Sequence, residues 1–144
     1  MCKEGDILCS KYKLKKQFNK GGFSSVWLAR DLKAQADFAL KIYNNIEDME
    51  EFRKGFNLVV NLTHSNIFKP LAYDIHNGVP FLVMSYCQHG STSTKIGKMS
   101  EDEVWKFAHD VAAGLAYLHD NKAIVHQDIK PGNILIDDGV HNLV

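Results

Sequence analysis

A short polar segment late in the chain carries the residues best suited to chemistry. Asp128, Lys130 and Asn133 fall within one stretch of six residues. An aspartate can accept the proton of an attacking hydroxyl group, and an asparagine oxygen can bind Mg²⁺. A lysine can place a positive charge beside a phosphoryl group in transit, and Pro131 restricts the backbone between these side chains. The segment therefore contains the groups that phosphoryl transfer from a nucleotide requires.

Residues 126–133, His-Gln-Asp-Ile-Lys-Pro-Gly-Asn, resemble the catalytic loop of the eukaryotic-type protein kinases, whose pattern is H-R-D-x-x-x-x-N. The resemblance implies that Asp128 is the catalytic base, that Lys130 supports the transferred charge and that Asn133 binds the metal. A lysine at position 130 is typical of the serine/threonine class. The implied activity is phosphoryl transfer from Mg-ATP to a serine or threonine hydroxyl of a protein.

A glycine pair near the N-terminus belongs to a second kinase-like segment, residues 19–26, which resembles the phosphate-covering loop G-x-G-x-x-G-x-V. Asn and Ser stand where the family has its first and third glycines, and a plain hairpin turn would also explain the glycine pair. The residues expected to contact the nucleotide here are Asn19, Lys20, Gly21, Gly22, Phe23, Ser24 and Val26.

Two further segments match the kinase pattern in the expected order. Ala39-Leu40-Lys41 resembles V-A-I-K, so the resemblance makes Lys41 a phosphate ligand and a catalytic residue. Residues 81–87 resemble the fifth strand and the hinge, with a gatekeeper side chain and two backbone contacts to adenine. The remaining nucleotide contacts that we expect are Ala39, Met84, Ser85, Cys87, Asn133 and Leu135.

Hydrophobic patterning predicts the elements that must position these residues. Strands are expected near 12–18, 25–29, 38–43, 68–72 and 80–85, with a helix over 46–62. Asn77-Gly78 is a strong hairpin signal between the last two strands. Ser100 and Glu103 form a capping box that should begin a helix with an apolar face from Val104 to Leu118.

The resemblance implies an α+β, two-lobe protein-kinase-like fold. A complete N-lobe, with a five-stranded antiparallel sheet and one helix, is expected over 10–84, followed by a hinge at 85–90. A truncated, mainly helical C-lobe is expected over 91–144, because no Asp-Phe-Gly follows residue 133. Without that second metal-binding residue, we expect this chain to be inactive alone and to expose the apolar helix face.

Two positions depart from the family pattern. Counting back from His64 puts Gly55 where active kinases have the helix glutamate that pairs with Lys41. Glu51 lies one helical turn earlier, and we hypothesise that it substitutes. Gln127 replaces the family arginine that binds a phosphate on the activation loop. We therefore expect that phosphorylation of the activation loop does not control this protein.

Composition narrows the class of protein. Lys plus Arg equal Asp plus Glu at 17 each, so no basic excess indicates nucleic acid. Three cysteines without a CxxC pair suit a reducing compartment, and the histidines show no zinc-binding spacing. No stretch approaches the roughly 20 apolar residues of a membrane span. We therefore expect a cytoplasmic protein with ATP, Mg²⁺ and a protein substrate as partners.

Two other functions remain open. A pseudokinase, acting as a nucleotide-binding or scaffolding module, would suit Gly55 and the lack of an Asp-Phe-Gly sequence after residue 133. A small-molecule phosphotransferase, acting on choline or an aminoglycoside, would suit the Pro131-Gly132-Asn133 run. Lys130 and the segment 64–67, which resembles H-P-N-I, favour the protein kinases over the second alternative. An Asp-Phe-Gly sequence soon after position 144 would favour catalysis over the pseudokinase.

Overall fold

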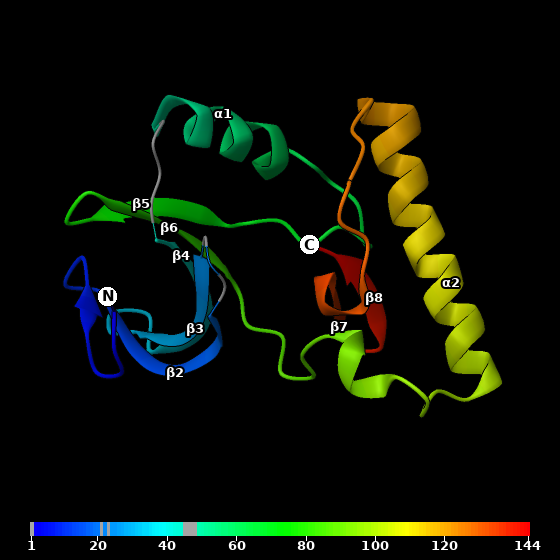
Figure 1. The fold of residues 1–144 in the computed structure, drawn as a ribbon, viewed down its shortest axis with the longest axis horizontal. Helices are drawn as coiled ribbons and strands as arrows, with labels where there is room; N and C mark the ends of the chain where they lie inside the picture. The colour runs from blue at the N-terminus through cyan, green and yellow to red at the C-terminus, as the bar shows by residue number, and fades with distance from the viewer. Residues whose placement is uncertain (1, 21, 23, 45–48) are drawn as a thin grey trace. The chain divides into compact units, whose positions relative to one another are not determined.

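The computed structural model describes residues 2–20, 22, 24–44 and 49–144. The chain divides into two compact units, and each is described by itself. The first unit comprises Met1–Asn61 and Lys69–Tyr86, and the second comprises Leu62–Phe68 and Cys87–Val144. The element labels used below are those of Figure 1.

Within the first unit, the described residues form a six-stranded antiparallel sheet in the order β1-β2-β3-β4-β6-β5. The strands are β1 (Ile7–Leu8), β2 (Tyr12–Lys20), β3 (Ser24–Asp31), β4 (Ala36–Tyr43), β5 (Ala72–His76) and β6 (Val79–Ser85). The predicted α+β fold is confirmed, and the two-residue strand β1 is an addition to the five strands expected. The strand placed near 68–72 was wrong in position, because it begins only at Ala72.

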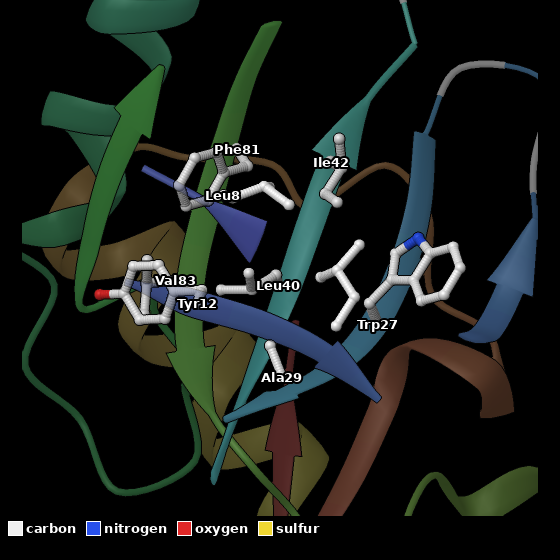
Figure 2. Close-up of a cluster of buried hydrophobic side chains, with 9 residues drawn as sticks. Leu8, Tyr12, Trp27, Ala29, Leu40, Ile42, Phe81 and Val83 are labelled. Carbon is white, nitrogen blue, oxygen red and sulfur yellow. The ribbon is translucent and has the colours of Figure 1, made fainter. Parts of the chain in front are cut away.

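One face of this sheet carries the main apolar core (Figure 2). Side chains alternate between the two faces of a strand, so every second residue of β3, β4 and β6 points into this core. The cluster consists of Leu8, Tyr12, Leu14, Trp27, Ala29, Leu40, Ile42, Phe81 and Val83. Trp27, Leu40 and Val83 are direct neighbours across three strands, which fixes the register of the sheet. The alternating residues of these strands are therefore directed to the opposite face.

Helix α1 (Met49–Val60) packs against that opposite face through aromatic side chains. Phe52 lies edge-on to Tyr43 of β4 at 5.2 Å and to Tyr73 of β5 at 5.6 Å between ring centroids. Phe56, one turn later, meets Tyr73 at 4.8 Å. These contacts place the two phenylalanines of α1 on the side of the helix that faces the sheet. Edge-to-face pairs of this kind stabilise packing by about 0.5–1.5 kcal/mol beyond their buried area.

The hairpin between β5 and β6 turns at the predicted dipeptide. Asn77 has φ 50° and Gly78 has φ 77°, so both residues are left-handed. Two consecutive left-handed residues define the type I′ turn, which matches the twist of the flanking strands. The Asn-Gly sequence thus sets the register of β5 against β6.

The second unit is built around helix α2 (Glu101–Ala116) and the hairpin of β7 (Ile134–Asp137) and β8 (Val140–Leu143). The predicted capping box is present: the Ser100 side chain accepts from the Glu103 N–H, and the Glu103 carboxylate accepts from the Ser100 N–H. A π-helical turn, Tyr117–Asn121, extends the helix. In Figure 1, β8 lies beside α2.

The exposure of α2 changes along its length. The side chain of Val104 in α2 is 48% exposed, and that of Leu118, in the π-helical turn that extends the helix, is 4% exposed. The apolar face that the sequence predicted as exposed is therefore open at its N-terminal end and covered at its C-terminal end.

The segment Leu62–Phe68 packs on β8, although it lies far from that strand in sequence. The backbone N–H of Leu143 donates to the Asn66 carbonyl at 2.9 Å, and the N–H of Phe68 donates to the Leu143 carbonyl at 2.6 Å. Gly114 of α2 allows this close approach: a Cβ at that position would lie 2.8 Å from Leu143 Cδ1 and 2.9 Å from the Asn66 carbonyl oxygen. Over the part of the chain that the structure describes, no helix is long and apolar enough to cross a membrane.

Candidate functional site

The loop 126–133 brings its three predicted functional side chains into direct contact. The ammonium Nζ of Lys130 lies 2.9 Å from the carboxylate Oδ2 of Asp128. The side-chain amide Nδ2 of Asn133 donates to the same Oδ2 at 2.7 Å and to the Asp128 carbonyl at 3.0 Å. Asp128 and Lys130 have side chains that are 61% and 58% exposed, so the cluster is open to a ligand.

These contacts determine the ionisation of the aspartate. Hydrogen bonds from Lys130 and Asn133 hold the pKa of Asp128 below its ordinary value. Asp128 is therefore an ionised acceptor at neutral pH, which is the state a base requires. Because the amide nitrogen of Asn133 is bonded to Asp128, its amide oxygen is the atom that suits a cation. Mg²⁺ prefers oxygen ligands, so the amide oxygen of Asn133 fits a magnesium site.

Local backbone geometry holds the loop in this shape. Gln127 adopts φ 66°, in the left-handed region. The residues Pro131–Asn133 form a 3₁₀ turn in which the Asn133 N–H donates to the Lys130 carbonyl at 2.9 Å. The Thr92 hydroxyl, from the 3₁₀ turn Thr92–Lys95, donates to the Pro131 carbonyl at 3.0 Å. A proline at the first position of such a turn loses no hydrogen bond, since its missing N–H would be unpaired there.

The sheet places a second group of predicted residues on one face. Val26 pairs with Lys41, and Lys41 pairs with Leu82. Ala39, two residues before Lys41, pairs with Met84. Cross-strand partners share a face, and so do residues two apart. Val26, Ala39, Lys41 and Met84 therefore lie on the face opposite the apolar core of Figure 2.

The surroundings of Lys41 include an aromatic ring. Its Nζ lies 5.5 Å from the centroid of the Tyr43 ring, within the range of a cation–π contact. On α1, Gly55 is exposed and a Cβ there would meet no atom within 4 Å. The backbone of Glu51 belongs to α1, but its side chain lies outside the described residues. The substitution of Glu51 for the missing glutamate therefore stays a hypothesis.

The glycine segment lies between two paired strands. Asn19 of β2 pairs with Val26 of β3, and Ser24 begins β3. The Asn44 side chain donates to the Gly22 carbonyl at 3.0 Å. Three of the predicted contacts cannot be placed: Gly21, Phe23 and the side chain of Lys20 lie outside the described residues.

The predicted hinge residues follow directly from β6. Met84 is 8% exposed, and Ser85 is the exposed last residue of the strand. Cys87 belongs to the second unit, where burial, with a smaller effect from the charge of Asp137, raises the pKa of its thiol to about 11. The thiol is therefore neutral and unreactive at physiological pH. Leu135, on β7, pairs with Asn142.

An aromatic pair beside the predicted nucleotide segments was missed by sequence reasoning. The rings of Phe18 and Tyr86 are stacked, with centroids 5.9 Å apart and an interplanar angle of 6°. Phe18 directly precedes Asn19, and Tyr86 directly follows Ser85. The available signal was an aromatic residue adjoining each of two predicted nucleotide-binding segments. A stacked pair at this place offers an apolar edge for a planar base.

Comparison with known proteins tests the family resemblance independently of the geometry of the site. The family model described as the protein kinase domain matches residues 12–144. The inhibitor of nuclear factor kappa-B kinase subunit alpha from Danio rerio is 27% identical over 146 residues, which cover 91% of this chain and 19% of that protein. CBL-interacting protein kinase 11 from Oryza sativa subsp. japonica is 27% identical, with 92% and 28% covered. The L-type lectin-domain containing receptor kinase V.5 from Arabidopsis thaliana is 31% identical, with 88% and 21% covered.

The chain thus spans between 19% and 28% of the length of these relatives.

Proposed function

The chain belongs to the protein kinase domain family, and from this premise we propose that it serves ATP-dependent phosphoryl transfer to a serine or threonine hydroxyl of a protein. The observation that carries the proposal is the bonded cluster of Asp128, Lys130 and Asn133. The serine/threonine class is supported by Lys130 and by one relative, 30% identical, that is named as a probable serine/threonine-protein kinase from Dictyostelium discoideum. Mg²⁺ is the metal that we propose, and the segment 85–90 is the proposed hinge.

Each residue of the loop has a distinct role in this proposal. Asp128 accepts a hydrogen bond from the substrate hydroxyl and orients it toward the phosphoryl group, because its ionised carboxylate can only accept. Lys130 stabilises the charge of the phosphoryl oxygens as they move. Asn133 would hold Mg²⁺ through its amide oxygen, while its amide nitrogen donates to Asp128 and keeps it in place. When bound, ATP would supply the phosphoryl group, and Mg²⁺ would neutralise part of its negative charge.

The sheet face of the first unit is the proposed nucleotide surface. Val26, Ala39 and Met84 present apolar side chains that suit the adenine ring, while Lys41 suits the α- and β-phosphates. Backbone groups of Ser85 and Cys87 are proposed to bind the adenine edge. The shared face of the four side chains supports this assignment, because a ligand bound on that face would lie beside all of them.

Residues 1–144 contain no Asp-Phe-Gly sequence after Asn133. Kinases use that aspartate as a second Mg²⁺ ligand. We therefore expect a polypeptide of these residues alone to bind nucleotide without transferring phosphate.

The test is a transfer assay with the full-length gene product, γ-labelled ATP and Mg²⁺, in which generic protein acceptors, choline and an aminoglycoside are offered as substrates. Labelled phosphoserine or phosphothreonine is expected, and Asp128→Asn should lower the rate by about 100-fold or more, as expected for loss of a positioned base. Asp120→Asn is the matched control, since Asp120 is exposed and lies outside the loop. Labelling of choline or an aminoglycoside in place of protein would contradict the proposed substrate class.

A pseudokinase is the second candidate, favoured by one observation. Gly55 provides no carboxylate at the position where active kinases pair a glutamate with the strand lysine. Nucleotide binding without phosphoryl transfer by the full-length gene product would support this candidate against catalysis.

A further inference from the structure

One residue of β8, His141, is held from two sides by buried polar side chains. The carboxylate Oδ2 of Asp110, on α2, accepts from the His141 backbone N–H at 3.0 Å and contacts the ring Nδ1 at 2.9 Å. From the other side, Asn66 Nδ2 donates to the His141 carbonyl at 3.0 Å. Asp110 and His141 are 5% and 6% exposed. A buried carboxylate persists only where donors compensate its lost hydration, and this one is compensated mainly by β8.

The charge of Asp110 is also compensated on its own helix. Lys106 Nζ lies 3.0 Å from the same Oδ2, and His109 Nδ1 lies 3.6 Å from Oδ1. Burial opposes ionisation, but the hydrogen bonds from His141 and Lys106 hold the pKa of Asp110 at about 2. An ionised carboxylate can only accept, so the ring Nδ1 of His141 carries the hydrogen of their contact.

The strand that Asp110 holds leads directly to the catalytic loop. Past its last residue, the backbone N–H of Val144 donates to the Asn133 carbonyl at 3.0 Å. Asn133 in turn donates through its side chain to Asp128 Oδ2 at 2.7 Å. The pairing of Ile134 with Leu143 adds a second connection between β8 and the residue after Asn133. The path from Asp110 to Asp128 therefore consists of hydrogen bonds, the backbone of β8 from His141 to Val144, and a strand pair.

We propose that Asp110 is a positioning residue for the loop 126–133: through His141 it fixes β8, and through β8 it fixes Asn133 and the Asn133–Asp128 contact. The effect of Asp110 on catalysis rests on the proposed function, whereas its effect on the position of the loop rests on these contacts alone. Packing of α2 on β8 is already provided by the approach of Leu143 to Gly114. A buried ion pair adds little net stability compared with apolar residues of similar volume. The groups that donate hydrogen bonds to the buried carboxylate must nevertheless occupy defined positions.

The test uses the full chain labelled with ¹⁵N, without nucleotide. Asp110→Asn is expected to shift the side-chain NH₂ signals of Asn133 and to lower the hydrogen-exchange protection of the Val144 amide at least tenfold. Ser100→Ala is the matched control, because it weakens α2 at the far end without contacting β8. A role in stability alone would change both variants alike, and that result would overturn the proposal.

A second variant covers the case in which Asp110→Asn does not fold. His141→Leu keeps the backbone N–H to Asp110 and loses the ring donor, so a smaller shift of the same Asn133 signals is expected. Unchanged Asn133 signals in folded His141→Leu or Asp110→Asn would overturn the proposal. The conservative His141→Gln, which restores a side-chain donor, should return the signals toward those of the wild type.

A failure of the proposed function would be seen in a different measurement, the binding of Mg-ATP. If Mg-ATP does not bind the wild-type chain, the kinase assignment fails while the NMR result still decides the role of Asp110.

Discussion

Two helical glycines in different surroundings allow a paired test of the packing described above. Gly55 is exposed in α1, and a Cβ there would meet no atom within 4 Å. Gly114 is buried in α2, and a Cβ there would lie 2.8 Å from Leu143 Cδ1 and 2.9 Å from the Asn66 carbonyl oxygen. Replacing either glycine by alanine changes the same atoms in the same type of secondary structure.

The magnitudes follow from two opposing effects. In a helix interior, alanine is more favourable than glycine by about 1 kcal/mol. Gly55→Ala should therefore raise the free energy of unfolding by about that amount. Gly114→Ala gains the same propensity but overpacks the contact with β8, which costs about 1–3 kcal/mol. The Leu143 methyl group can rotate away, whereas the Asn66 carbonyl is backbone and is itself bonded to the Leu143 N–H. We expect the cost to exceed the gain.

Urea unfolding followed by circular dichroism measures both variants against the wild-type chain. The prediction is a higher midpoint for Gly55→Ala and a lower midpoint for Gly114→Ala, with the m-value unchanged in each case. Equal stabilisation by the two substitutions would refute the close packing of α2 on Asn66 and Leu143. A loss of stability in Gly55→Ala would refute the exposed helical setting of Gly55.

Three further predictions test other features. Ser100→Ala removes the hydrogen bond from the Glu103 N–H to the Ser100 side chain, so urea unfolding should show a free energy of unfolding lower by about 1 kcal/mol. An unchanged free energy would contradict a stabilising cap. The pKa of Asp110 is lowered from 3.8 to about 2, so its contribution of about 2 kcal/mol is present above pH 4 and lost as pH falls through 2. Asp110→Asn should flatten unfolding free energy against pH in that window, and parallel curves would refute the assignment. Phe18→Ala removes the stack on Tyr86, and calorimetry should show ATP affinity reduced roughly 2- to 10-fold, with Phe18→Leu closer to wild type. An unchanged affinity in Phe18→Ala would exclude the pair from the nucleotide surface.

Local sequence signals predicted the elements with strong, short-range causes. The capping box at Ser100 and the Asn77-Gly78 turn each need only a few neighbouring residues, and both are present as expected. The strand near 68–72 was placed too early because apolar residues at Phe68 and Leu71 resemble a strand. Phe68 instead bonds to Leu143 of β8, a partner that no local pattern reveals.

The contacts within the candidate site were predictable only in part. The spacing of Asp128, Lys130 and Asn133 indicated a shared loop, and the structure brings their side chains together. Asp110 and His141 gave no signal, because their pairing joins residues 31 positions apart. Phe18 and Tyr86 likewise meet only through the fold. Long-range polar and aromatic pairs depend on tertiary packing, which periodicity does not encode.

The most direct test of the central claim is whether the Lys41 face of the sheet binds ATP. Isothermal calorimetry should compare the wild-type chain with Lys41→Met and with the control Lys13→Met, since Lys13 is an exposed lysine on β2. Loss of a charge-assisted contact to phosphate costs about 1.5–3 kcal/mol, which corresponds to roughly 10- to 100-fold in affinity. Mg-ATP should bind the wild-type chain saturably, with an affinity that falls by that factor in Lys41→Met and is unchanged in Lys13→Met. Equal affinity in all three proteins, or no binding by the wild type, would contradict a nucleotide site on this face.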